Sequence, residues 1–208
     1  VPLPENRPEV GPIEEVSTPN VGTIEDVCKF LKKKPKDLIK TLIYTTPGVL
    51  TESKKSIGRE KAKHDGRSVI VGDFVDYQTV AVLVRGDHEV NDEKLRIAVG
   101  GPVELAEENE IKLATGAAPG FAGPVGILDE VDMMFVDHSV AAMIAGVTGA
   151  NKTDYHITRV VPGRDFLLDG NKVKVLDIRN AVDGDTFEGK KLLFRRGIEV
   201  GQVFKLGT

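Results

Sequence analysis

The segment Ala118 to Ile127, with the sequence APGFAGPVGI, concentrates glycine and proline without a single ionisable side chain. A glycine-rich turn stiffened by proline presents backbone N–H groups at close range, with no side chain in the way. Such groups can stabilise the oxyanion of a tetrahedral intermediate. The competing interpretation is a tight connection between strands, in which glycine only satisfies the backbone geometry. The glycines and prolines concerned are Gly120, Gly123, Gly126, Pro119 and Pro124.

Three side chains could add chemistry to such a turn, and each has a structural alternative. Lys40 begins a predicted strand among apolar neighbours, so its ammonium group either reaches solvent or points into a cleft towards an anion. His156 lies in another predicted strand, where a histidine is more often structural than a ligand. His88 lies in the polar segment GDHEVND directly after a strand. That segment is either a site loop or the first turn of a helix capped by Asn91.

The usual catalytic and metal-binding signatures are missing from the sequence. It has no G-x-S-x-G elbow, no phosphate-binding loop and no H-E-x-x-H zinc motif. The four histidines have neither metal-like spacing nor cysteine partners, so we expect no metal site. The single cysteine, Cys28, excludes an internal disulfide and is typical of a reducing cytoplasm. Without an apolar run of ~20 residues or a signal-peptide pattern, we expect a soluble, cytoplasmic protein with no membrane partner.

Charge is unevenly distributed along the chain. The net charge of -4 over 208 residues gives no overall argument for nucleic-acid binding. Basic residues nevertheless crowd 29–40 and 54–67, whereas acidic residues concentrate in 104–110 and 129–132. Each basic run can be a local site for a polyanion or a solvated face.

The elements that must position these residues alternate irregularly. Thr23 is predicted to cap a first helix, a second helix follows Asn91, and a third covers 106–115. The polar segment 47–67 is predicted to be a mobile loop or insertion. Because regular crossovers are too few for a doubly wound sheet, we predict an α+β fold with a mixed β-sheet surrounded by helices. Strands are expected at 39–45, 68–71, 79–85, 131–137, 155–160, 172–176 and 192–195.

Nine short motifs together resemble bacterial prolyl-tRNA synthetases, and specifically the editing domain inserted in those enzymes. They cover nearly the whole chain apart from 47–67, and their common order makes the resemblance specific. It implies a Pro-rich connector at 1–20, an editing domain at 21–186 with a basic insertion at about 47–67, and a return into catalytic-core sequence at 187–208. The motifs are VSTPNVGTIEDVCKFL, IKTLIY, VLVRGDHEVNDEKL, GFAGPVGI, DHSVAAM, GANKTDYH, GRDF, DIRNAVDGD and RRGIEVGQVFKLGT.

The resemblance implies a proofreading hydrolase. A synthetic pocket wide enough for proline cannot strongly exclude alanine, because a missing methylene is worth only about 1–3 kcal/mol. A second site that admits alanine and rejects proline can then hydrolyse the mischarged ester. The implied substrate is tRNA for proline carrying alanine, the implied partner is the remainder of the parent synthetase, and no cofactor is expected for editing.

Site residues follow from the resemblance motif by motif. The family's G-x-x-x-P motif corresponds to Gly120 through Pro124, and it is expected to line the reaction centre with backbone amides. Lys40 matches the family's essential lysine, with an electrostatic role. His156 is expected to shape the amino-acid pocket, and Asp137 to lie on the same cleft. The residues expected to be catalytic are Lys40, Gly120, Gly123 and Pro124, and those expected to bind substrate are Phe121, Ala122, Asp137, His156 and His88.

Two other functions remain open at this point. One is a free-standing-type deacylase of the same fold that acts on cysteinyl-tRNA; the synthetase-like segment at 187–208 argues against it. The other is a non-catalytic insertion that only binds tRNA or braces the synthetase. Retention of Lys40, Gly120, Pro124 and His156 argues against such decay.

Overall fold

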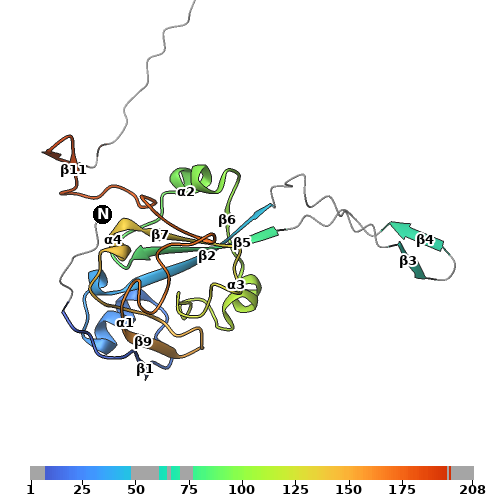
Figure 1. Cartoon of the computed structure of the whole chain (residues 1–208), viewed down its shortest axis with the longest axis horizontal. Helices are drawn as coiled ribbons and strands as arrows, with labels where there is room; N and C mark the ends of the chain where they lie inside the picture. Colours follow the sequence, from blue (N-terminus) through green and yellow to red (C-terminus); the bar gives the residue numbers. More distant parts are fainter. Residues whose placement is uncertain (1–7, 48–60, 65–66, 71–76, 196, 198–208) are drawn as a thin grey trace, which may run out of the picture.

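A computed structural model describes residues 8–47, 61–64, 67–70, 77–195 and 197 of the chain. At its centre is a five-stranded mixed sheet (Figure 1). Three strands run parallel, a fourth pairs antiparallel with the last of these, and a short fifth strand pairs antiparallel with the fourth. In spatial order the strands are β10 (Val173–Leu176), β7 (Met133–Asp137), β5 (Tyr77–Arg85), β2 (Ile39–Pro47) and β6 (Glu104–Leu105).

Both faces of the central sheet are covered, which explains the continuous apolar runs in β5 and β7. Successive side chains of a strand point to opposite faces. On β7, Met134 and Val136 belong to one core cluster, whereas Phe135 between them belongs to the other. All three residues are at most 1% exposed. The predicted α+β fold with a mixed sheet is therefore confirmed.

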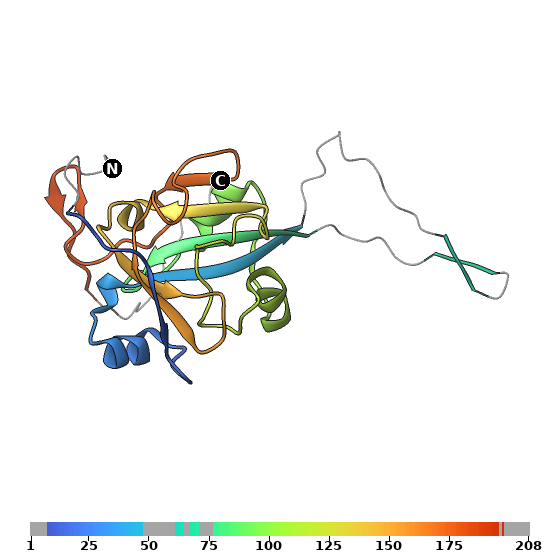
Figure 2. The ribbon, with the colours of Figure 1, turned by 60° about the horizontal axis from the view of Figure 1, so that its bottom comes forward.

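A smaller antiparallel sheet packs against the first face, below the central sheet in Figure 1. Its order is β1 (Glu14–Ser17), β9 (Tyr155–Val160) and β8 (Gly146–Gly149). The helices α3 (Glu108–Thr115) and α4 (His138–Ala141) contribute to the same core. The second view shows the small sheet crossing below the long strands (Figure 2).

Two helices complete the unit. α2 (Asp92–Val99) covers the opposite face of the central sheet and buries Leu95 completely. α1 (Ile24–Leu31) packs through Val27 against Val147 of β8 and Leu38 just before β2. The first residues of β2 form an open edge of the sheet, because β6 pairs only with Tyr44 and Thr45. α1 lies beside this open edge.

The predicted helix ends agree with the structure. Thr23 accepts a hydrogen bond from the backbone N–H of Asp26, and Asn91 accepts one from that of Lys94, as N-cap residues do. Gly116 ends α3 in the left-handed conformation that glycine adopts without strain. α3 begins at Glu108, two residues later than predicted.

Two boundaries differ from the predictions. β1 pairs with β9 inside the connector predicted for 1–20, so the folded unit includes residues ahead of 21. The strand predicted at 192–195 is wrong: a hairpin of β11 (Thr186–Phe187) and β12 (Lys190–Lys191) forms instead. Glu188 and Gly189 both have positive φ, as a two-residue hairpin turn requires, and this turn sets the pairing.

The segment predicted as an insertion, 47–67, falls mostly outside the described residues. Its described part includes β3 (Lys61–His64), which pairs with β4 (Arg67–Ile70). Most of 187–208, including 198–208, likewise lies outside the described residues. Within the described ranges, no helix combines the length and apolar character needed to cross a membrane.

Candidate functional site

A cavity of about 200 Å³ lies at the open edge of β2. Its walls come from the first residues of β2, from α1, from β8 and β9, and from the glycine-rich loop. It brings together four of the residues predicted from sequence, although they are far apart in the chain. These are Lys40, Gly120, Ala122 and His156.

The glycine-rich loop lies directly on the backbone of β8. A Cβ atom at Gly123 would be 1.9 Å from the carbonyl oxygen of Gly149. A Cβ atom at Gly149 would in turn be 2.2 Å from the backbone of Phe121. Only glycine permits this approach of two backbones, so both sequence interpretations of the segment are partly right. It is a tight connection, and it also forms a cavity wall.

Asn151 ties the loop to the strand, and sequence reasoning missed it. Its side-chain oxygen accepts the N–H of Gly123 at 2.7 Å, and its side-chain amide donates to the carbonyl of Val125 at 2.9 Å. Its own backbone N–H donates to the carbonyl of Phe121 at 2.9 Å. Asn151 also has a φ of 54°, a conformation that asparagine tolerates better than most residues. The tolerance of asparagine for this conformation was the signal, within the segment GANKTDYH, that could have pointed to Asn151.

The hydrogen bond between Gly123 and Asn151 changes the role expected of Gly123. Because its N–H already donates to Asn151, this amide is not free to stabilise an oxyanion. Phe121 likewise donates its N–H to the carbonyl of Ala118. By contrast, the N–H groups of Gly120 and Ala122 have no hydrogen-bond partner among the described residues, and both residues line the cavity. The available donors of the G-x-x-x-P segment are therefore Gly120 and Ala122.

His156 holds the other end of the loop. Its Nδ1 lies 2.7 Å from the hydroxyl of Thr18, and it also hydrogen bonds to the backbone of Gly120. Because only a ring N–H can bond to a carbonyl, Nε2 carries the proton and the Thr18 hydroxyl donates to Nδ1. Burial lowers the pKa of His156, which favours this neutral form. Both ring nitrogens are thus occupied, and the ring is 4% exposed and packs against Phe121.

Lys40 is the only charged residue lining this cavity within the described structure. Its Nζ lies 2.8 Å from Oε1 of Glu89. The lysine side chain is 16% exposed, whereas the glutamate side chain is 75% exposed. Ion pairs with so exposed a partner contribute little, about 0–1 kcal/mol. An anionic or carbonyl group of a ligand can therefore compete with Glu89 for this ammonium group.

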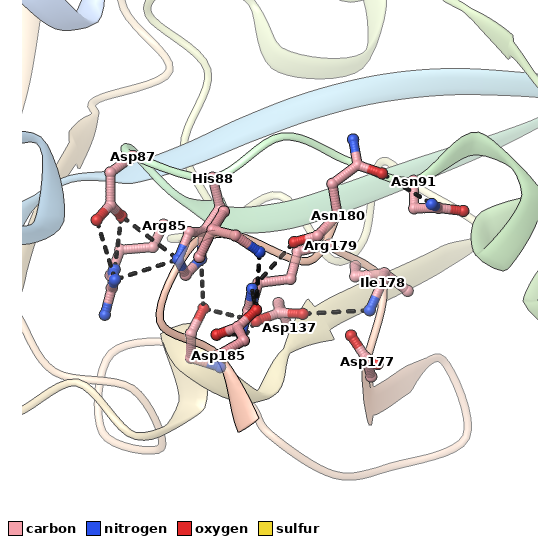
Figure 3. A network of polar contacts seen from close by, with 12 residues as sticks. Arg85, Asp87, His88, Asn91, Asp137, Asp177, Ile178, Arg179, Asn180 and Asp185 are labelled. Carbon is pink, nitrogen blue, oxygen red and sulfur yellow. Dashed lines mark hydrogen bonds and ion pairs between the residues drawn. The ribbon is translucent and has the colours of Figure 1, made fainter. Parts of the chain in front are cut away.

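Asp137 and His88 do not line this cavity, contrary to the prediction. They belong to a polar network at the end of β7 (Figure 3). Asp137 accepts hydrogen bonds from the backbone and hydroxyl of Ser139 and from the N–H of Ile178. His88 lies 3.1 Å from both the Ser139 hydroxyl and the guanidinium group of Arg85. These hydrogen bonds to the Asp137 carboxylate hold β7, α4 and the chain after β10 together.

A second, larger cavity of about 570 Å³ adjoins this network and includes Asp137 in its wall. Its two basic side chains already have partners: Lys94 lies 2.8 Å from Asp177, and Arg179 lies 2.7 Å from Asp185. The Arg179 guanidinium holds the pKa of Asp185 far below its usual range. Both basic side chains of this cavity are therefore already paired, whereas Lys40 of the smaller cavity has, among the described residues, only the exposed Glu89 as its partner.

We predict that Gly149→Ala destabilises the protein. The added methyl group would meet the backbone of Phe121 and Ala122, which cannot move without displacing the loop. We expect a loss of about 1–3 kcal/mol in the free energy of unfolding, measured by urea denaturation. Gly101→Ala is the matched control, because a Cβ atom there would have only one neighbour, at 3.9 Å. Equal stability of the two variants would contradict the close packing.

The sequence is similar to an aminoacyl-tRNA editing family and to part of the proline–tRNA ligases. The aminoacyl-tRNA editing domain family matches residues 66–166. A proline–tRNA ligase of Thermoanaerobacter sp. (strain X514) is 42% identical over 205 residues, and one of Maridesulfovibrio salexigens is 39% identical over 199 residues. These alignments cover 96% and 94% of this chain but 30% and 28% of the relatives. The chain thus spans about 30% of the length of the curated relatives it matches.

Solved structures share the fold at low sequence identity. One is a hypothetical protein, with a TM-score of 0.57 and 18% identity, over 81% of this chain and 92% of its own. Another, assigned as a trans-editing enzyme for prolyl tRNA synthetase, has a TM-score of 0.56 and 17% identity, over 81% and 87%. Residues 66–166 therefore belong to the aminoacyl-tRNA editing domain family, and the chain as a whole is similar to a segment of proline–tRNA ligases.

Proposed function

We propose that this chain hydrolyses the ester of alanyl-tRNA for proline and leaves prolyl-tRNA intact. One observation carries the proposal: a small cavity is lined by Lys40 and by Gly120 and Ala122, whose backbone N–H groups have no partner among the described residues. Donors fixed in this way suit a carbonyl oxygen that gains negative charge during ester hydrolysis. The family match to an aminoacyl-tRNA editing domain supports the same class of substrate.

The proposed reaction needs no general base from the protein. Water attacks the ester carbonyl carbon, the bond to the ribose oxygen breaks, and a proton from the water ends on that oxygen. Gly120 and Ala122 would donate to the carbonyl oxygen, and Lys40 would favour the developing charge or hold the terminal nucleotide. His156, with both ring nitrogens occupied, would act as a wall. An aminoacyl ester is already activated, so a positioned water and these donors are sufficient.

Discrimination by size follows from the construction of the cavity walls. The glycine-rich loop is held in place, because Gly123 lies against Gly149 and the His156 ring hydrogen bonds to Gly120. Rigid walls around about 200 Å³ suit a small side chain. In the double-sieve scheme, such a site hydrolyses only what is small enough to enter. Cysteine is close to alanine in size, so cysteinyl-tRNA is the natural competitor.

The substrate's nucleic-acid part has a suitable surface beside the cavity. Five lysines between the last turn of α1 and the short helical turn at Pro35–Asp37 are exposed, and none has a carboxylate partner among the described residues. α1 itself lines the cavity through Thr23, Ile24 and Val27. Exposed ammonium groups close in sequence to the cavity-lining residues of α1 and β2 suit the phosphates of an acceptor stem. We name this set the α1 lysines: Lys29, Lys32, Lys33, Lys34 and Lys36.

We predict that the wild-type chain cleaves alanyl-tRNA for proline and that Lys40→Ala lowers the rate by about 10²–10³-fold, by analogy with the loss of one stabilising group. The measurement is release of labelled alanine, beside prolyl- and cysteinyl-tRNA. Glu89→Gln is the matched control, since it removes the partner of Lys40 and keeps the ammonium group. Equal cleavage of prolyl-tRNA would refute the size sieve, and faster cleavage of cysteinyl-tRNA would favour the cysteinyl-tRNA deacylase.

We also predict that replacing Lys32, Lys33 and Lys36 by glutamine weakens binding of tRNA for proline. With three ammonium groups removed, the slope of log affinity against log salt should become shallower by about 2–3 units. The measurement is fluorescence-detected binding over a salt series. Lys190→Gln with Lys191→Gln, in the exposed strand β12, is the control and should leave the slope unchanged. An unchanged slope in the α1-lysine variant would show that this face is merely solvated.

A further inference from the structure

Phe30 is an exposed aromatic residue on α1, a helix that lines the smaller cavity and lies at the outside of the folded unit (Figure 2). Phe30 is 50% exposed, whereas Val27, one turn earlier, is 2% exposed. The other apolar residues of α1 pack with Leu38 and Val147, but Phe30 is not part of that cluster. Single exposed apolar residues are ordinary on a protein surface, so exposure alone assigns no role to this ring.

The spacing along α1 puts Phe30 on the same side of the helix as residues of the cavity wall. Thr23 and Val27 line the cavity, and Phe30 follows Val27 by three residues. Positions three and four apart are neighbours on a helix surface, with about 5–6 Å between their Cβ atoms. The Phe30 ring is therefore the next side chain beyond the cavity wall on this side of α1.

Exposed ammonium groups flank Phe30 in the chain. The α1 lysines include its direct neighbour Lys29 and continue after it to Lys36. The chain then turns back, and residues 38–40 line the cavity again. Both ends of this basic segment thus lie in the cavity wall, and the exposed ring lies between them.

An exposed aromatic ring among exposed cations suits one class of ligand. Proteins bind single-stranded nucleic acid by stacking its bases on aromatic side chains and by holding its backbone in a positively charged groove. In a duplex the bases are stacked on one another, and only unpaired nucleotides can offer a base to a side chain. The lysines alone would suit any run of phosphates, whereas the ring favours an unpaired strand.

We propose that Phe30 is a stacking platform for an unpaired base at the 3′ end of the substrate tRNA, with the α1 lysines on the phosphates beside it. This inference rests on the proposed function, because the aminoacyl ester is carried by the last nucleotide of that end. With the ester in the cavity, the preceding unpaired nucleotides follow α1 past Val27 to Phe30. The platform holds a base by its face, so it orients the strand without reading its sequence.

The test compares uncharged tRNA for proline with the same tRNA lacking its unpaired 3′ nucleotides, by fluorescence-detected binding at one salt concentration. The wild-type chain should bind the complete tRNA more tightly. Phe30→Ala should weaken that binding about 10-fold, as expected for the loss of one base stacked on an aromatic ring, and leave the truncated tRNA unaffected. Phe30→Trp should keep the affinity for the complete tRNA. Phe30→Leu, which is apolar but has no aromatic face, should lose it.

Phe187→Ala is the matched control. Phe187 is 65% exposed and is paired with Lys190 in the β11–β12 hairpin, but it lines the larger cavity. This variant should bind both tRNAs as the wild type does. Phe30→Ala should also keep a melting temperature close to that of the wild type, because the ring lies outside the cluster beneath α1. A lower melting temperature with equal loss of affinity for both tRNAs would overturn the proposal, since the ring would then support the fold.

Binding and hydrolysis are measured separately, so the two claims can be told apart. If the wild-type chain cleaves alanyl-tRNA and Phe30→Ala binds the complete tRNA equally well, the platform is refuted and the function stands. If Phe30→Ala weakens binding of the complete tRNA alone but the wild type cleaves no ester, the platform stands and the hydrolytic function is refuted.

Two further results would overturn the stacking platform. Wild-type affinity in Phe30→Leu would show that an apolar contact suffices without an aromatic face. A wild-type chain that binds the complete and truncated tRNAs equally, or binds neither, would show that the unpaired end makes no contact with α1. The exposed ring would then be left for a protein partner.

Discussion

Gly123 and Gly149 bring two stretches of backbone closer together than any side chain would allow. Through this contact the loop lies flat on β8 and cannot recede. Asn151 fixes the middle of the loop, and His156 fixes its start at Gly120. Because Gly123 and Phe121 already donate their N–H groups, the amides of this loop segment that have no partner among the described residues are those of Gly120 and Ala122. The geometry of the site is a consequence of packing between backbones.

This architecture relies on neutral groups. Burial keeps His156 uncharged, and its two hydrogen bonds leave it no free nitrogen for proton transfer. Among the described residues that line the cavity, Lys40 supplies the one charge, and its partner Glu89 is largely exposed. The more conspicuous charged network, around Asp137 and Arg179, lies elsewhere and is internally satisfied (Figure 3). Ester hydrolysis by water develops an oxyanion. The smaller cavity, which is lined mostly by neutral groups, suits this reaction better than the larger one beside the charged network.

Sequence reasoning recovered most of the fold, because helix caps such as Thr23 and Asn91 and the alternation of apolar residues are local signals. It also placed Lys40, Gly120, Ala122 and His156 at one site, through a resemblance whose motifs keep a common order. It failed where the outcome depends on pairing at a distance. Nothing local to Asp137 shows that its carboxylate is used by Ser139 and Ile178, or that the amide of Gly123 is taken by Asn151.

The central claim is that the backbone amides of Gly120 and Ala122 receive the carbonyl of the aminoacyl group. The most direct test is a ¹H–¹⁵N NMR titration of the protein with the 3′-amide of alanine on adenosine. We predict downfield shifts of the Gly120 and Ala122 amide protons, as expected for a new hydrogen bond to each, and little change at Gly123, whose N–H remains with Asn151. Shifts confined to the residues around Asp137 and Arg179 would contradict the account, because they would place the ligand in the larger cavity.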